Sequence, residues 1–320
     1  MSAPWLALGV GLLLGVMCGC APDPELDASV IKDLRVLGLA VERPGEVVAV
    51  GPPDDTHPLY VFADDPPPTT LTALVVDPRA PAGPLRVSAR MCLAEHETCD
   101  PGAANTVSLA EDAPAVPEII ALPVQLRAAH LNAWLAEEYW HGYDRLFVRV
   151  ELTVAGLNGE RVHAQTVVTY YGPTFVRRAD RGAVDERLPL TNPTDLRVLQ
   201  RGATVAEAIN VLADRSFALA PGQMLLMQLL GNYVFADVSY TLPTGDQKYP
   251  RRHLESYAEI VSLYTVHGRV DPPAFVATEP DGFRYTAPER AEGLPDTLYI
   301  VVHDALGGCA WARWTMVNAP

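Results

Sequence analysis

The feature that most constrains the fold is a succession of short apolar runs, each closed by proline, glycine or aspartate. Leu85–Met91 alternates apolar and polar residues, which is typical of a half-buried strand. Thr69–Val76 is apolar and β-branched, as in a core strand, and Asp77-Pro78 ends it. Asn158-Gly159 joins two further runs in the manner of a hairpin. With 29 prolines and 23 glycines, the chain is predicted to be mainly β, with many strands joined by turns.

An internal repeat divides the chain in two. The five residues Asp195–Leu199 are identical to Asp33–Leu37. Leu146–Val150 likewise has a counterpart of the same pattern in Leu298–Val302. A chain of 320 residues is long enough for two domains with a core in each, so two modules of common design are expected. The predicted modules are residues 30–172 and 194–320, with an arginine-containing linker at 173–193 that is either solvated or anion-binding.

One amphipathic helix is predicted at residues 123–139, inserted in the first module. Pro123 can occupy its first turn, and apolar residues recur at intervals of three and four. Trp134, Tyr139 and Trp140 gather near its end. These rings either cover an open edge or end of the sandwich or form a ligand platform for a sugar or peptide; the first is preferred because helical stripes usually face a core. The stripe consists of Val124, Ala128, Leu131, Leu135 and Tyr139.

The N-terminal stretch reads as an export signal. Leu6–Met17 is apolar, has the length of a secretory signal, and is too short to span a bilayer. Val16-Met17-Cys18-Gly19-Cys20 resembles the lipobox of bacterial lipoproteins, whose cysteine is lipidated and becomes the new N-terminus. The resemblance implies a signal peptide at 1–20 and lipidation of Cys20. Because Ala21 follows, it also implies an anchor in the outer membrane of the cell envelope, on its periplasmic or its surface side.

The segment after Cys20 and the charge of the leader bear on this interpretation. Residues 21–29 contain prolines and acids and are predicted to form a short tether. Residues 1–20 contain no lysine or arginine, which departs from the usual basic start of a signal peptide. The alternatives are a leader that is cleaved without lipidation and a buried N-terminal helix.

Two cysteines bracket a short segment of the first module. In an exported protein, Cys92 and Cys99 are expected to form a disulfide. The alternative is a metal site, because Cys92, His96 and Cys99 together supply three soft ligands. Cys309 has no obvious partner, and it is either a buried thiol or a contact of Cys92 or Cys99 if the modules pack closely.

A second resemblance concerns the modules themselves. Tyr285-Thr286-Ala287-Pro288, followed by Leu298–Gly308, looks like the closing half of bacterial Ig-like modules. The chain after the leader also resembles tandem Ig-like lipoproteins of myxobacteria, which begin with a strand like Lys32–Leu37. The resemblance implies two Ig-like β-sandwich domains in tandem, and it implies no chemistry. Related repeats can bind calcium between modules, but Asp304 alone supplies too few oxygen ligands, so no cofactor is predicted.

Charge and motifs exclude several functions. A net charge of −15 repels phosphate backbones and argues against a nucleic-acid partner. The sequence contains no His-Glu-x-x-His, Gly-x-Ser-x-Gly or phosphate-loop motif, so no enzyme is predicted. The expected function is that of a non-catalytic, lipid-anchored envelope protein for scaffolding, adhesion or ligand capture, with an envelope protein or glycan as partner. The alternative is a secreted carbohydrate-binding or hydrolytic sandwich protein, with Trp134 and Trp140 lining a groove.

Overall fold

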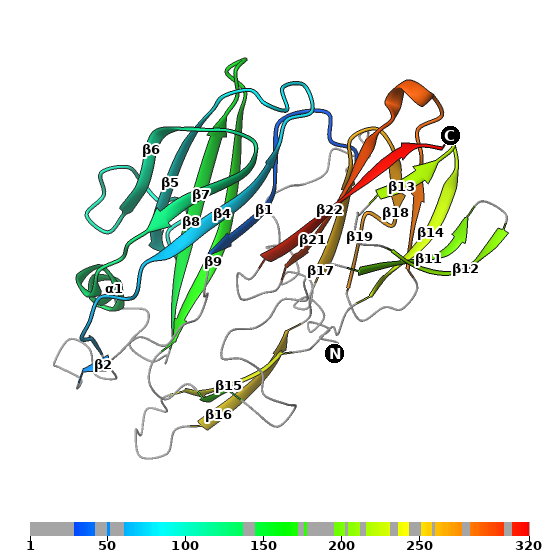
Figure 1. The fold of residues 1–320 in the computed structure, drawn as a ribbon. Coiled ribbons are helices and arrows are strands. Elements are labelled where there is room, and N and C mark those ends of the chain that lie inside the picture. Colours follow the sequence, from blue (N-terminus) through cyan, green and yellow to red (C-terminus); the bar gives the residue numbers. More distant parts are fainter. Residues whose placement is uncertain are drawn as a thin grey trace, which may run out of the picture.

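The structure is a computed structural model. It describes residues 29–41, 50–51, 61–136, 145–171, 176–177, 195–201, 204–211, 216–230, 236–242, 251–257, 260–276, 282–303 and 309–319. Two β-sandwiches lie side by side, and a short helix lies at one end of the first (Figure 1). The predicted fold class, mainly β with two Ig-like sandwiches in tandem and a helix in the first, is confirmed by the strand order described below.

The first sandwich packs two antiparallel sheets against each other. Its strands are β1 (Arg35–Val41), β4 (Thr69–Val76), β5 (Leu85–Leu93), β6 (Val107–Ala115), β7 (Glu118–Val124), β8 (Arg145–Ala155) and β9 (Arg161–Tyr171). The sheet orders are β1-β4-β7 and β6-β5-β8-β9. Alternate side chains of the central strands, such as Val87 and Met91 of β5 and Val150 of β8, fill the core between the sheets. This arrangement follows directly from the period-two pattern of the sequence.

The second sandwich repeats this arrangement with more strands. They are β11 (Asp195–Arg201), β12 (Thr204–Val211), β13 (Ser216–Leu219), β14 (Met224–Leu230), β17 (Ile260–Thr265), β18 (Arg269–Asp271), β19 (Ala274–Val276), β20 (Phe283–Thr286), β21 (Asp296–His303) and β22 (Cys309–Asn318). The sheet orders are β12-β11-β14-β20-β18 and β13-β22-β21-β17-β19. Its core includes Tyr285, Ile300 and Trp314.

The two sandwiches have equivalent topologies. The order β1-β4-β7 in the first corresponds to β11-β14-β20 in the second, and β5-β8-β9 corresponds to β17-β21-β22. In both, the chain leaves the first of these sheets after its second strand in this correspondence (β4 or β14), returns to it for the third (β7 or β20) and ends in the other sheet, as in Ig-like sandwiches. The identical segments 33–37 and 195–199 therefore lie at the start of equivalent strands, β1 and β11. The second pair of similar segments lies in β8 and β21, which are also equivalent.

Smaller elements complete the described part. A short 3-10 helix follows β20, and the other strands form two small sheets, β2-β3 and β10-β15-β16. β10 falls within the predicted linker 173–193 and pairs with β15; the other residues of that linker lie outside the described ranges. The elements are β2 (Val50–Gly51), β3 (Val61–Phe62), β10 (Val176–Arg177), β15 (Ala236–Leu242), β16 (Arg251–Tyr257) and the 3-10 helix (Ala291–Gly293).

The helix is shorter than the predicted span 123–139. Helix α1 comprises Ala128–Leu135, and residues 137–139 lie outside the described ranges. The predicted start was wrong, because Pro123 and Val124 end β7 and pair with Thr70 and Thr69 of β4. Pairing with β4 overrides the local helical pattern, and Pro123 is tolerated because β7 lies at the edge of its sheet.

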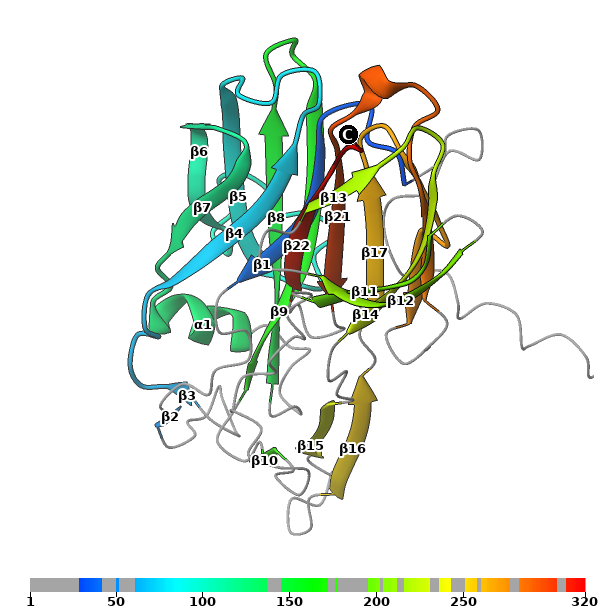
Figure 2. The same cartoon turned by 45° about the vertical axis from the view of Figure 1, so that its right-hand side comes forward.

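A third apolar cluster joins the two sandwiches. On β4, Leu74 and Val76 point away from the core of the first sandwich, and on β21, Tyr299 and Val301 point away from the core of the second. The outer faces of these two sheets therefore pack on each other, and β1 runs beside β22 (Figure 2). We call these residues the intermodule core: Ile31, Leu37, Leu74, Val76, Tyr299 and Val301, with Tyr264, Val266, Cys309 and Trp311 partly buried against them.

The N-terminal residues of the described chain bind to the second sandwich. The Thr265 amide donates to the Ser29 carbonyl, and the Ile31 amide donates to the Thr265 carbonyl, both over 2.7 Å. The predicted tether 21–29 is therefore wrong at Ser29, which is buried and held by a backbone hydrogen bond; residues 21–28 lie outside the described ranges. Ile31 belongs to the intermodule core, so the first module of 30–172 begins with a segment that contacts both sandwiches.

Candidate functional site

A disulfide closes the loop that follows β5. Cys92 and Cys99 are bonded, with Cα atoms 5.4 Å apart, and both are buried. The predicted disulfide is confirmed. The metal alternative with His96 is wrong, because both sulfur atoms are bonded to each other. Within the described ranges, no group of three or more His, Cys, Asp or Glu side chains is placed to hold a metal ion.

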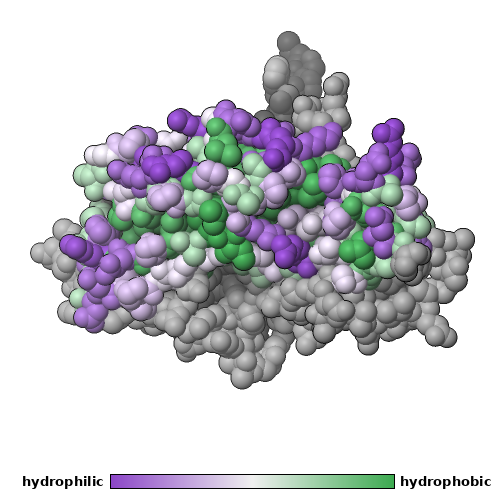
Figure 3. All heavy atoms as spheres, turned by 45° about the horizontal axis from the view of Figure 1, so that its top comes forward, coloured by the Kyte–Doolittle hydropathy of each residue, from purple (hydrophilic) through white to green (hydrophobic). Residues whose placement is uncertain are grey.

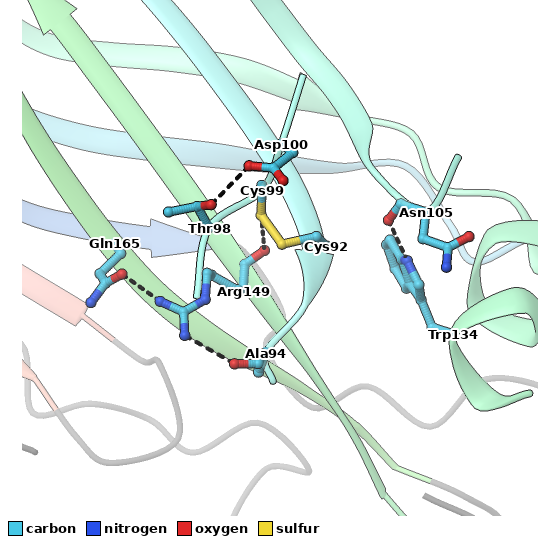
Figure 4. Close-up of a disulfide and its surroundings, with 9 residues drawn as sticks. All are labelled: Cys92, Ala94, Thr98, Cys99, Asp100, Asn105, Trp134, Arg149 and Gln165. Atoms are coloured by element: carbon cyan, nitrogen blue, oxygen red, sulfur yellow. Dashed lines mark hydrogen bonds between the residues drawn. A yellow bond between two sulfur atoms is a disulfide. The ribbon is translucent and has the colours of Figure 1, made fainter. Parts of the chain in front are cut away.

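Arg149 of β8 holds the start of this loop by a hydrogen bond (Figure 4). Its Nη2 donates to the Ala94 carbonyl over 2.9 Å, and its Nη1 donates to Gln165 Oε1 over 2.5 Å. The Ala94 amide in turn donates to the Phe147 carbonyl over 3.0 Å. The loop is thus held by a covalent bond on one side and by hydrogen bonds to β8 on the other, and Gln165 of β9 orients the Arg149 side chain.

The closed loop presents polar side chains to solvent. Glu95, His96, Glu97 and Thr98 are exposed, and Thr98 Oγ1 donates to Asp100 Oδ1 over 2.9 Å. We call residues 93–99 the stapled loop. Carboxylates and an imidazole on a rigid turn suit recognition of a basic or hydrogen-bonding partner, because little conformational entropy is lost when such a loop binds.

Trp134 of α1 does not form a surface platform. Its side chain is 1% exposed, and its indole Nε1 donates to the Asn105 carbonyl over 2.8 Å (Figure 4). The predicted ligand platform of Trp134, Tyr139 and Trp140 is therefore wrong for Trp134, which is a core residue. Tyr139 and Trp140 lie outside the described ranges. Buried tryptophan usually finds such an acceptor for its N–H, so this ring has a structural role.

A charged group borders the intermodule core. Glu118, the first residue of β7, accepts a hydrogen bond from Arg313 of β22, with Oε2 2.6 Å from Nη1. Tyr299 of β21 lies against the same carboxylate. Burial, followed by the charge of Glu118 and a hydrogen bond to it, raises the pKa of the Tyr299 phenol well above its ordinary value. Glu118 thus ties the first module to two strands of the second.

Asp296 organises the end of the second sandwich where Ser29 binds. Its buried carboxylate accepts hydrogen bonds from the Tyr285 hydroxyl over 2.8 Å and from the Gly268 amide over 2.7 Å. The amides of Val266, His267 and Thr297 also donate to it. Burial, together with the nearby Asp296 carboxylate, raises the pKa of Tyr285 far above its ordinary range. This network fixes the turn after Thr265 and has the character of a structural site.

Two glycines allow close packing, one beside the Asp296 carboxylate and one in the intermodule core. A Cβ on Gly268 would lie 2.6 Å from Asp296 Oδ2. A Cβ on Gly38 of β1 would lie 2.9 Å from Cε3 of Trp311 and 3.1 Å from Sγ of Cys309. Cys309 therefore lies against β1 in the intermodule core, and the alternative that it contacts Cys92 or Cys99 is wrong.

Several residues of interest lie elsewhere in the chain. Cys20 of the lipobox and Asp304 of the calcium alternative lie outside the described ranges. Within those ranges, no helix is long and apolar enough to cross a membrane.

The sequence contains a signal for the intermodule core that strand prediction did not use. The runs Leu74–Val76 and Leu298–Val302 are apolar without alternation, which is typical of strands buried on both faces.

Comparison with known proteins adds little to this description. No family model matches the chain, and no curated protein matches it. The solved structures to which the chain is similar include the periplasmic chaperone SfaE (13% identity, covering 67% of this chain and 97% of that chain, TM-score 0.23), the D0–D1 domain of intimin (11%, 88% and 99%, 0.17) and extracellular domains 3–5 of Drosophila OTK (9%, 91% and 99%, 0.17). TM-scores this low carry no argument, so the Ig-like assignment rests on the strand order.

Proposed function

We propose that the chain is a non-catalytic, lipid-anchored protein of the outer membrane, in which two Ig-like modules form one rigid body for scaffolding or adhesion. The observation that carries this proposal is the intermodule core, in which Leu74 and Val76 of one sandwich are buried against Tyr299 and Val301 of the other. Modules joined in this way keep a fixed relative position, whereas modules joined by a linker alone move independently.

A rigid body of this kind holds the stapled loop at a fixed place. The loop lies at the end of the first sandwich opposite to the end at which Ser29 enters, because β5 begins at the Ser29 end and finishes at Leu93. An anchor at Cys20 would leave the stapled loop on the far side of the molecule from its attachment. We propose this loop as the contact for an envelope protein or glycan.

The carbohydrate-binding alternative receives no support from Trp134. A stacking platform for a sugar needs an accessible ring face, and this ring is buried in the first core. The stapled loop offers polar groups in place of aromatic faces. An adhesion or scaffolding contact with a protein or with hydroxyl-rich glycan therefore fits the described residues better than a hydrophobic sugar groove.

Intact mass of the protein extracted from membranes tests the anchor. The expected mass is that of residues 20–320 with an acylated Cys20, less two hydrogens for the disulfide. An unlipidated mass would overturn the anchored function. Binding of envelope fractions tests the contact: Glu95→Ser/Glu97→Ser should lose binding, and Glu111→Ser/Asp271→Ser, two exposed acids on β6 and β18, is the matched control that should retain it. Retained binding in the loop variant, or an equal loss in the control, would contradict the proposed role of the loop.

A further inference from the structure

The chain enters the fold at one defined end. Ser29 and Ile31 are bound to Thr265 at the last residue of β17, and Asp33 Oδ1 lies 3.0 Å from Nη1 of Arg79. Arg79 also forms an ion pair with Glu160, next to the β8–β9 hairpin. The segment that follows the predicted tether is thereby attached both to the second sandwich and to the loops at one end of the first. We call this end of the molecule the entry end.

The length of the tether limits where the entry end can lie. Cys20 and Ser29 are nine peptide units apart, and an extended chain spans at most about 3.6 Å per residue, so Ser29 lies within about 32 Å of Cys20. The eleven residues of β8 alone extend over about 36 Å. When Cys20 is in a membrane and the strands of the first sandwich stand roughly perpendicular to it, the entry end is therefore the part of the molecule nearest to the lipid.

Exposed apolar side chains gather at the same end. Val116 and Leu157 are each 61% exposed and Ile119 is 57% exposed. Val116 lies in the turn from β6 to β7, Ile119 is the second residue of β7, and Leu157 lies at the tip of the β8–β9 hairpin. Of the four large apolar residues exposed in the described ranges, only Val276 lies elsewhere; it pairs with Ile260, at the opposite end of β17 from Thr265. Hairpin tips are usually polar, so Leu157 is unusual.

The position of these residues on one end follows from strand pairing. Glu118 pairs with Val75 at the end of β4, and Ala155 pairs with Arg86 at the start of β5. Both places adjoin the loop that carries Arg79, and therefore the entry end. Figure 3, turned so that the top of Figure 1 comes forward, shows green apolar residues interspersed with purple polar ones on the visible face.

The charge of the entry end also suits a membrane. The whole chain carries 24 basic and 39 acidic residues, an excess of acid that would repel anionic lipid. The loops of the entry end are close to balanced. With the strand residues next to them, their basic residues are Lys32, Arg35, Arg79, Arg161, Arg269 and Arg290, and their acidic residues are Asp33, Asp77, Glu118, Glu160, Glu289, Glu292 and Asp296.

From these observations we infer that the entry end faces the lipid bilayer, with Leu157, Val116 and Ile119 in the headgroup region. This inference rests on the proposed acyl anchor at Cys20. A single apolar side chain adds little affinity, but next to a covalent anchor three of them suffice to orient the molecule, because the anchor already supplies the attachment. The stapled loop then points away from the membrane.

The test places an environment-sensitive fluorescent amino acid at position 157 or, as the matched control, at position 276, in the acylated full-length protein. The protein is reconstituted into vesicles of phosphatidylethanolamine and phosphatidylglycerol that contain headgroup-quencher lipid. The expected result is a blue-shifted emission at 157 and quenching several times stronger than at 276. In a second pair of variants, Leu157→Asp/Val116→Asp should weaken the quenching of a probe at 119, whereas Val276→Asp should not.

Each other outcome overturns the inference. Equal quenching at 157 and 276, or aqueous emission at both, would show that the entry end does not face lipid. A blue shift at 157 that depends on protein concentration without vesicles would assign this surface to a second copy of the chain. The intact mass of the same sample separates the two proposals: an acylated protein with an aqueous probe contradicts the orientation alone, and an unacylated protein contradicts the anchor on which the orientation rests.

Discussion

Glu118 of the first module and Arg313 of the second form an ion pair across the border between the two sandwiches, with the carboxylate oxygen 2.6 Å from the guanidinium nitrogen. The pair lies at the rim of the intermodule core, and its side chains are 30% and 57% exposed. Solvent screens an ion pair of this kind, so most of the coupling between modules comes from the apolar residues behind it.

The first prediction compares the rim with the intermodule core. Glu118→Gln is expected to lower the free energy of unfolding by about 0.2–1 kcal/mol, as for other partly exposed pairs. Leu74→Ala should lower it by about 2–5 kcal/mol, because it removes a buried side chain from a packed contact. Urea denaturation measures both, and the exposed Leu157→Ala serves as a control within about 0.5 kcal/mol of the parent. A Leu74→Ala cost no larger than that of Leu157→Ala would contradict the intermodule core.

The second prediction concerns calorimetry of the same variants. Two modules that share a buried core unfold together, so the parent protein should show a single thermal transition. Leu74→Asp places a charge in that core and should split the transition into two, one for each sandwich. Two separated transitions in the parent protein would mean that the modules are independent.

The third prediction concerns Asp296. Asp296→Asn replaces one acceptor oxygen by a donor amide that faces backbone N–H groups, so at least one buried donor loses its partner. The expected loss of stability is about 2–4 kcal/mol. Asp271→Asn, at an exposed position of β18, should change stability by less than about 0.5 kcal/mol. Gly268→Ala tests the same site independently, since its Cβ would collide with the Asp296 carboxylate. Parent-like stability of both site variants would remove the structural role of Asp296.

The sequence predicts some strands with their observed bounds and overlooks others. β4 matches the predicted run Thr69–Val76 because its residues are apolar and β-branched and end at a clear turn. β6 is missed because its pairing with β5 is interrupted by register shifts, and Asp112 within it has a positive φ of 48°. These irregularities remove the period of two on which strand prediction depends. The start of α1 is misplaced because a local helical pattern cannot reveal pairing with β4.

The candidate sites divide in the same way between local and long-range signals. The disulfide follows from two cysteines that are close in sequence and from the expected compartment. The N–H of the buried Trp134 indole is satisfied by the carbonyl of Asn105, 29 residues away, and the ion pair of Glu118 depends on Arg313, which is 195 residues away. The intermodule core was visible only as two apolar runs without alternation. Such a pattern shows that both faces of a strand are covered, but it does not show what covers them.

The fourth prediction concerns pH and His303, at the end of β21. Burial lowers the pKa of His303 below its ordinary value near 6.5. The unfolded chain therefore takes up the proton first, so the free energy of unfolding is highest above about pH 6.5 and falls as the pH decreases through the folded-state pKa. His303→Gln should flatten this acid dependence in urea titrations at successive pH values. His96→Gln, in the exposed stapled loop, is the control and should retain the parental slope; a parental slope in His303→Gln would exclude His303 as its source.

The last prediction separates the two supports of the stapled loop. Cys92→Ala/Cys99→Ala opens a ring of eight residues, and the loop-entropy relation gives a loss of stability of about 2.5 kcal/mol. Arg149→Lys keeps the charge but cannot donate to Ala94 and Gln165 in the same forked geometry, so it should loosen the loop with a smaller loss of global stability. Amide hydrogen exchange distinguishes these effects. Residues 94–98 should exchange faster in both variants, while amides of β17 and β21 keep their protection in Arg149→Lys. Unchanged exchange at 94–98 in both variants would mean that neither bond holds the loop, and its role as a preorganised contact would have to be abandoned.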